Sequence, residues 1–270
     1  MEFGVLGPLR VVVDGRMVPI ASARQRAMLA LLLVSANRSV SSHRMIDAVW
    51  GEHPARSVRN MVHTYMWQLR ALLTRGGESR LVTEPAGYVL RVEPGELDLR
   101  RFDGLVDQGR AALARGEASR AAEKLRAALG LWRGEPFADV TLYDDDQAAE
   151  ALRLEEARVA AWEDRIEAEL DLGRHERLIG ELRQAALRHP LRERIAGQLM
   201  LACYRSGRQA DALAAFDRIR LLLASELGLD PGRKLRELHQ GILCADPDLL
   251  NGRTELRARL RITLLQELSG

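Results

Sequence analysis

The sequence predicts an α+β winged helix-turn-helix domain at the N-terminus, followed by an all-α domain of tetratricopeptide-like helical repeats. Three observations support this fold class. Residues 1–92 contain short strand patterns, three helical patterns and a final hairpin pattern, in that order. Residues 102–250 are almost entirely helical in pattern, with glycine at the turns between paired helices, as helical repeats require. The two parts also differ in charge.

The charge is distributed unevenly along the 270 residues. Residues 1–92 hold 12 Arg and 6 Asp or Glu, a net charge of +6. Residues 93–270 hold 28 basic and 32 acidic residues, a net charge of −4. Only two of the basic residues are lysines, Lys124 and Lys234. We therefore expect an anionic partner for the first part of the chain.

Composition and motifs exclude several classes of protein. Apolar residues make up 47% of the chain, enough for a sizeable core. Cys203 and Cys244 are isolated, so neither a disulfide framework nor a zinc ribbon is indicated. The N-terminal MEFGVLGPLRVVV lacks the pattern of a signal peptide, and no apolar run is long enough to cross a bilayer. We expect a cytoplasmic, nucleoid-associated protein.

The first elements follow from turn and cap signals. Asp14-Gly15 is a tight-turn signal between short strands of a small antiparallel sheet. Ser22 is expected to cap a helix that runs to Asn37, and Ser41 or Ser42 a short helix that ends at Trp50-Gly51. Val40 is a candidate single strand residue between these helices. The expected strands are residues 2–6, 9–13 and 17–20.

The helical pattern over residues 57–74 has two distinct faces. Its apolar side consists of Val58, Met61, Val62, Tyr65, Leu69, Leu72 and Leu73. Its opposite side carries Asn60, His63, Thr64, Trp67 and Ala71, flanked by Arg59, Arg70 and Gln68. Trp67 points away from the apolar side, which is unusual for a large aromatic residue. Such a helix suits a DNA major groove, although an ordinary surface helix has the same pattern.

A β-hairpin is expected directly after this helix. The sequence RLVTEPAGYVLRV consists of an apolar strand, a turn at Glu84-Pro85-Ala86-Gly87, and a second strand. The domain boundary is expected at Val92-Glu93-Pro94-Gly95. The helices expected beyond it are residues 105–115, 119–132, 148–172, 175–188, 191–205 and 209–227. In the last of these, Ala210, Ala214 and Phe216 are expected at close-packing positions.

Residues 1–92 resemble the OmpR-type winged-helix DNA-binding domain in FGVLGPLRV, QRAMLALLL, IDAVWGE, QLRALL and GYVLRV. The string HPLRERIAGQLMLACYRSGRQADALAAFDRIRLLLASELGLDPGRKLRELHQGIL resembles the bacterial transcriptional activation domain. The whole chain is similar to the Streptomyces antibiotic regulatory protein family. The resemblance implies a winged-helix domain over residues 1–92 and an activation domain over residues 98–250, with residues 251–270 outside it as a short helix.

By resemblance, the helix at 57–74 enters the major groove and the hairpin wing reaches an adjacent minor groove. The residues implied to contact DNA are Arg24, Trp50, Arg59, Asn60, His63, Thr64, Tyr65, Trp67, Gln68, Arg70 and Tyr88. Tyr88 matches the phosphate-contacting aromatic of the wing. Trp67-Gln68 stands where family members commonly carry Ser-Arg or Arg-Arg, so a different operator is expected. The alternative to DNA contact for Tyr65 is a place in the core. The alternative for Trp67 is burial against a second protomer or against the second domain.

The resemblance implies an activator of a secondary-metabolite (antibiotic) gene cluster that binds direct repeats as a dimer and recruits RNA polymerase with its σ factor. An alternative is a repeat scaffold for a protein or ligand, with the winged helix as a docking module. No catalytic, metal or cofactor site is indicated. The histidines at 43, 53 and 63 match no metal pattern, and Asp144-Asp145-Asp146 is better explained as a solvated loop. No GxxxxGK[ST] motif is present, so ATPase activity is not expected.

Overall fold

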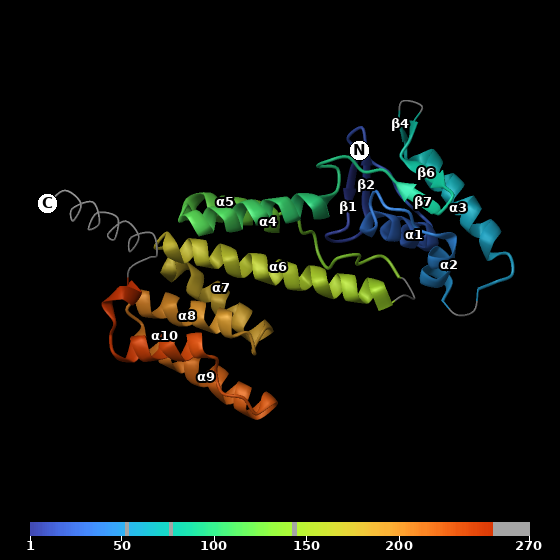
Figure 1. Ribbon diagram of the computed structural model, residues 1–270. Coiled ribbons are helices and arrows are strands. Elements are labelled where there is room, and N and C mark those ends of the chain that lie inside the picture. The colour runs from blue at the N-terminus through green and yellow to red at the C-terminus, as the bar shows by residue number, and fades with distance from the viewer. Residues whose placement is uncertain (52–53, 76–77, 142–144, 251–270) are drawn as a thin grey trace. The chain divides into compact units, whose positions relative to one another are not determined.

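The computed structural model describes residues 1–51, 54–75, 78–141 and 145–250. The expected helix over residues 251–270 lies outside this part of the chain. The described residues form an N-terminal α+β part and then helices, as the sequence predicts (Figure 1). No described helix is long and apolar enough to span a membrane.

The chain begins with a three-stranded antiparallel sheet in the order β1-β2-β3. The strands are β1 (Glu2–Gly4), β2 (Arg10–Val13) and β3 (Arg16–Met17). Phe3 pairs with Val11 across the first two strands, and both side chains are buried. Asp14-Gly15 forms the expected turn, with positive φ at both residues.

Three helices follow the sheet: α1 (Ala23–Val34), α2 (Ser42–Trp50) and α3 (Val58–Leu72). Residues 27–33 of α1 are all buried, so this helix forms the centre of the core. The Ser41 side chain caps α2 by accepting a hydrogen bond from the Arg44 amide, whereas Ser22 makes no side-chain cap bond. α1 ends before the expected Asn37, whose side chain exchanges two hydrogen bonds with the backbone of Val92.

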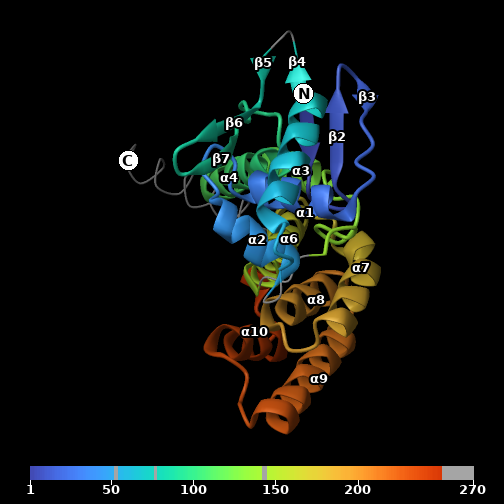
Figure 2. The same ribbon diagram turned by 90° about the vertical axis from the view of Figure 1, so that its right-hand side faces the viewer.

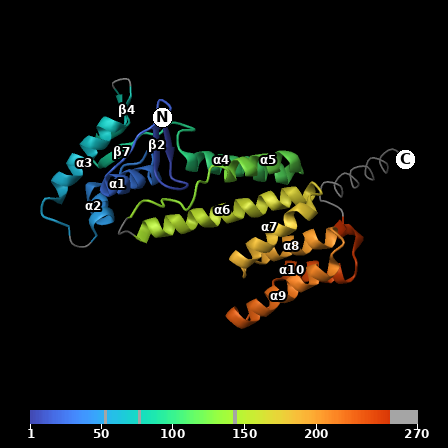
Figure 3. The ribbon, with the colours of Figure 1, turned by 180° about the vertical axis from the view of Figure 1, so that it is seen from behind.

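The wing consists of β6 (Leu81–Glu84) and β7 (Gly87–Leu90), joined by the expected turn. Val40 forms an isolated antiparallel bridge with Tyr88, so its predicted role as a single strand residue is confirmed. A short strand pair, β4 (Thr74–Arg75) and β5 (Glu78–Ser79), was not predicted. Views from two sides place α3 beside the wing (Figures 1 and 3).

Gly87 is required by the close approach of the wing to Val40. Its φ is +144°, and a Cβ there would lie 2.1 Å from the Val40 carbonyl oxygen. Replacing Gly87 with alanine is therefore expected to lower the free energy of unfolding by about 2 kcal/mol. Thermal unfolding followed by circular dichroism measures the effect. Gly15→Ala is the control, because Gly15 also has positive φ but no atom within 4 Å of its Cβ position. An equal loss in both variants would contradict the argument.

The remaining helices account for most of the described chain after Val92. They are α4 (Asp98–Arg115), α5 (Ala118–Leu129), α6 (Asp145–Asp171), α7 (His175–Arg188), α8 (Glu193–Arg205), α9 (Gln209–Leu227), α10 (Arg233–Leu243) and the 3₁₀ helix η1 (Pro247–Leu250). The bounds of α7 and α9 are those predicted. α4 begins earlier than the expected residue 105, and α5 ends before the expected Trp132.

The described chain divides into two compact units. Unit 1 contains Met1–Val106 and Ala127–Val159, and unit 2 contains Asp107–Arg126 and the described residues from Ala160 onward. Thus α4, α5 and α6 each contribute residues to both units. The domains expected over residues 1–92 and 98–250 are continuous in sequence, whereas the two compact units are not. These domain limits stay a prediction.

Asp98 joins separate segments of unit 1. Its carboxylate accepts hydrogen bonds from the backbone amides of Val5 (2.9 Å) and Leu6 (3.2 Å) and from the Arg133 guanidinium (2.9 Å). Arg133 also donates to the Pro8 carbonyl oxygen at 2.9 Å. The first residue of α4 is therefore tied to the segment between β1 and β2 and to the segment after α5.

In unit 2, α7, α8, α9 and α10 pack in succession (Figure 2). The buried side of α9 consists of Ala212, Phe216, Ile219 and Leu223. Phe216 is thus a packing residue, as expected, but the expectation for Ala210 and Ala214 is wrong because both are exposed. The buried positions are separated by four, three and four residues, and neither alanine falls on that side of the helix.

Candidate nucleic-acid interface

α3 presents a polar surface with one large aromatic side chain. Trp67 is 67% exposed, and Arg59, Asn60, His63 and Thr64 are exposed around it. The buried side of the helix consists of Val58, Val62, Met66 and Leu69. The predicted polar face is therefore the outer face, and Met66 is added to the predicted inner side. Tyr65 and Gln68 are half-buried at its edges.

His63 contacts a residue of the wing, Tyr88 on β7. The Tyr88 hydroxyl lies 2.9 Å from His63 Nδ1, and the two rings meet edge to face. Tyr88 is only 4% exposed. Burial raises the pKa of its phenol above the ordinary value, against the opposing effects of the Arg70 cation and a hydrogen bond with Ser42. Tyr88 therefore keeps its proton near neutral pH. It is itself buried and contacts His63, whose side chain is exposed on α3.

Gln68 is anchored to α1. The buried Gln25 amide donates a hydrogen bond to Gln68 Oε1, the oxygen that a bidentate contact with adenine also uses. One lone pair of that oxygen is thus already engaged. Sequence reasoning did not single out Gln25. The available signal was a polar residue inside an apolar helix, since buried polar groups normally have a specific partner.

Arg70 ties α3 to the wing. Its Nε donates to the Leu81 carbonyl oxygen at 3.0 Å, and a terminal nitrogen donates to the Thr83 hydroxyl at 2.7 Å. Both acceptors belong to β6. The guanidinium of Arg70 is therefore committed to holding the wing against the helix, a role that the sequence pattern did not indicate.

The remaining predicted residues connect the three helices or stay exposed on α3. The Arg24 guanidinium lies 5.4 Å from the centre of the Trp50 ring, and that ring lies 6.4 Å from the Tyr65 ring. This series links α1, α2 and α3. On the outer face, the Thr64 hydroxyl donates to the Asn60 carbonyl oxygen at 3.0 Å, which leaves its lone pairs as acceptors.

These features define the chain as a winged-helix regulator with an exposed third helix, joined to a helical domain. Residues 18–90 match the family model described as transcriptional regulatory protein, C terminal, and residues 97–243 match the bacterial transcriptional activator domain. The chain belongs to the Streptomyces antibiotic regulatory protein family of DNA-binding transcription regulators, as its similarity to individual members also shows. Family members are regulators of transcription, not enzymes.

Two similar proteins come from Streptomyces species. The chain is 43% identical over 250 residues to regulatory protein AfsR of Streptomyces coelicolor, covering 92% of this chain and 25% of AfsR. It is 35% identical over 272 residues to regulatory protein DnrI of Streptomyces peucetius, covering 98% of this chain and 100% of DnrI. The chain thus spans about a quarter of the length of AfsR and the whole of DnrI.

A solved structure shares the fold. It is that of Mycobacterium tuberculosis EmbR in complex with a low affinity phosphopeptide, with a TM-score of 0.87 and 38% sequence identity. The match covers 98% of this chain and 70% of the EmbR chain. The winged helix and the tetratricopeptide-like helical domain therefore occur together in both proteins.

Proposed function

We propose that this protein activates an antibiotic or other secondary-metabolite gene cluster by binding direct repeats upstream of a promoter. It would act as a homodimer on DNA, recruit RNA polymerase with its σ factor, and reside in the cytoplasm on the nucleoid. The observation that carries the proposal is the exposed polar face of α3 around Trp67. Similarity to regulators such as AfsR and DnrI supports the same class of activity.

In the proposed complex, α3 lies in the major groove with Asn60, His63, Thr64 and Trp67 toward the bases. Trp67 packs on a thymine methyl group or on the sugar-phosphate wall. Gln68 is held by Gln25, so it contributes one remaining acceptor site and its amide group. Family members commonly place an arginine at this point of the helix, and this chain therefore prefers a site with less guanine at the corresponding position.

The phosphate contacts are proposed for Arg24, Trp50, Arg59 and Tyr65, which border the outer face of α3. Arg70 and Tyr88 are proposed as supporting residues, because one holds the wing and the other holds His63. A phenol that donates to Nδ1 leaves the histidine proton on Nε2, where it is available as a donor to a base.

Tyr88→Phe tests this supporting role. The variant keeps the ring but loses the hydroxyl that contacts His63 Nδ1, so affinity for the promoter fragment is expected to fall about threefold to tenfold. Fluorescence anisotropy of labelled DNA measures it. In a His63→Ala background the Tyr88→Phe change should have no further effect on DNA affinity. If it lowered the affinity by the same factor there as in the wild-type chain, the hydroxyl would act through another contact.

The proposal itself is tested by binding of the full chain to fragments of neighbouring promoters. The full chain is required because the compact unit that contains α3 also includes Ala127–Val159, which a fragment of residues 1–92 would lack. Footprints on direct repeats are expected, with an affinity per protomer that falls on the order of 12-fold between 50 and 200 mM salt for the two arginine contacts, Arg24 and Arg59. No binding at low salt would refute DNA recognition. Tight binding of a protein partner with flat salt dependence would instead favour a docking module.

A further inference from the structure

The side-chain amide of Gln68 on α3 is held in one orientation by a residue of α1. Gln25 is 9% exposed, and its Nε2 donates a hydrogen bond to Gln68 Oε1. Because the donor is buried, this bond turns the oxygen of the Gln68 amide toward the interior of unit 1. The oxygen is therefore occupied by a contact within the protein.

The nitrogen of the same amide is left on the outer side. An amide group is planar, and its oxygen and nitrogen lie on opposite sides of the bond that joins it to the side chain. Gln68 Nε2 makes no hydrogen bond with any residue that the structure describes, and it does not belong to the buried polar atoms that lack a partner. Its N–H groups are therefore accessible, so Gln68 presents donors to the outside.

The neighbours of Gln68 place these donors on the outer face of α3. Gln68 lies one helical turn after the exposed Thr64 and directly after Trp67, which is 67% exposed. Trp67-Gln68 thus offers an apolar ring and a hydrogen-bond donor side by side.

In the major groove, thymine carries the complementary pair of groups, a methyl group at C5 and an acceptor at O4. Guanine has an acceptor at the equivalent position but no methyl group, whereas adenine and cytosine have an amino donor there. The two-bond contact of a glutamine with adenine needs the amide oxygen as acceptor. In this chain that oxygen faces Gln25, so the usual preference of glutamine for adenine is not expected.

We propose that Gln25 sets the base preference of α3 by holding Gln68 as a donor, so that Trp67-Gln68 reads a thymine. Gln68 Nε2 donates to thymine O4, and Trp67 covers the methyl group. Gln25 is a positioning residue, because it is buried on α1 and acts through Gln68. The inference rests on the proposed function, since it requires α3 in the major groove.

Fluorescence anisotropy of the full chain with modified duplexes tests the two contacts separately. Each thymine of a footprinted repeat is replaced in turn by 4-thiothymine, which weakens the acceptor at position 4, or by uracil, which lacks the methyl group. Both bases still pair with adenine. At one thymine, the sulfur substitution is expected to weaken binding about tenfold and the loss of the methyl group about fourfold.

Gln25→Glu tests the positioning role. An ionised carboxylate accepts hydrogen bonds and donates none, so the Gln68 amide is expected to turn over, with Nε2 toward α1 and Oε1 outward. This variant should lose the sulfur effect but keep the methyl effect, and should prefer adenine or cytosine at that position. Gln25→Met removes the anchor without adding a charge and should reduce the sulfur effect to about twofold or less.

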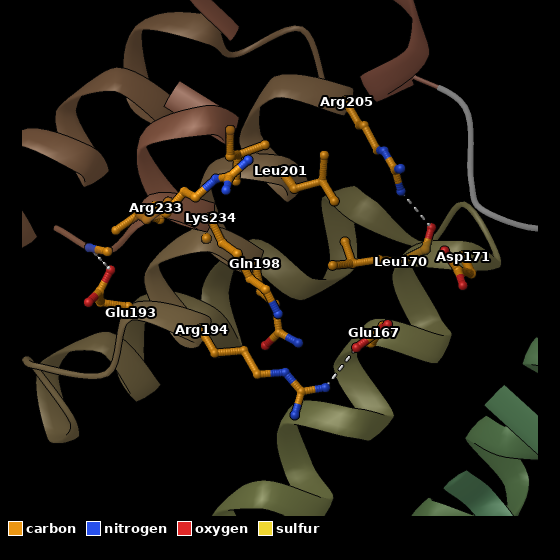
Figure 4. A pocket seen from close by; sticks show the side chains of 14 residues that line it. Glu167, Leu170, Asp171, Glu193, Arg194, Gln198, Leu201, Arg205, Arg233 and Lys234 are labelled. Atoms are coloured by element: carbon orange, nitrogen blue, oxygen red, sulfur yellow. Dashed lines mark hydrogen bonds and ion pairs between the residues drawn. The ribbon is translucent and has the colours of Figure 1, made fainter. Parts of the chain in front are cut away.

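Gln198→Glu is the matched control, because it makes the same change at an equally buried glutamine in unit 2. Gln198 is 8% exposed, and its Nε2 donates to the Glu163 carbonyl oxygen at 2.7 Å. It lies near Arg194 on α8, in the wall of a hollow of about 650 Å³ (Figure 4). This variant should keep both effects of the wild-type chain. Each effect is a ratio of two affinities of one protein sample, so a loss of folded protein does not alter it.

Two results would overturn the inference while DNA recognition stands. One is a wild-type chain that tolerates 4-thiothymine at every thymine of the repeat, and the other is an unchanged sulfur effect in Gln25→Glu. If the wild-type chain bound no duplex at low salt, the proposed function would be refuted, and this inference with it.

Discussion

Asp98→Ala is expected to lower the free energy of unfolding by about 3–5 kcal/mol, the largest stability effect that we predict. The carboxylate is 8% exposed and accepts bonds from two backbone amides and a guanidinium. Its removal leaves the buried amides of Val5 and Leu6 without an acceptor and Arg133 without its counter-charge. Each buried unsatisfied group costs about 1–3 kcal/mol.

Urea denaturation of the full chain, followed by circular dichroism, measures this effect. Asp107→Ala is the control, because Asp107 is an exposed aspartate of the same helix and its removal should change stability by less than about 0.5 kcal/mol. Asp98→Asn should fall between the two, since it keeps one acceptor oxygen. A stable Asp98→Ala variant would mean that the network contributes little.

Trp67→Ala is expected to weaken binding to the promoter fragment about 30-fold, which corresponds to about 2 kcal/mol for an exposed tryptophan that becomes buried in an interface. The same change should leave the thermal midpoint nearly unaltered, because the side chain is 67% exposed in the free protein. Anisotropy titrations at fixed salt concentration measure the affinity.

Met17→Ala is the matched control for this substitution. Met17 is 68% exposed, lies on β3 in the same unit, and is also a large apolar residue on the surface. Its loss should leave DNA affinity unchanged. If both substitutions weakened binding equally, the effect would reflect general surface hydrophobicity and not a contact made by α3.

The sequence predicted the features that depend on local periodicity. The faces of α3 followed from the helical repeat, and the bounds of α7 and α9 followed from the residues that interrupt it, such as His189-Pro190 and Ser206-Gly207. The two-residue strands β4 and β5 were missed because strands so short have no periodic signal. Ala210 and Ala214 were misplaced because small residues fit both sides of a helix.

The supporting contacts of the candidate site were beyond sequence reasoning. Gln68 meets Gln25 and His63 meets Tyr88, and the members of each pair lie 43 and 25 residues apart in the chain. Amphipathic patterns indicate which side of an element is buried, but they do not identify the partner on a neighbouring element. The buried position of Tyr88 and the engagement of Arg70 by β6 arise from such pairings.

The division of α4, α5 and α6 between two compact units has a consequence for building chimeric regulators. A graft that exchanges only residues 1–92 would transplant Val5, Leu6 and Pro8 without Asp98 and Arg133, their hydrogen-bonding partners. Donor and recipient would then need compatible backbones at these positions. A transplant that retains residues 93–106 and 127–159 of the donor carries the matching surfaces with it. The exchangeable module of this regulator is thus discontinuous in sequence.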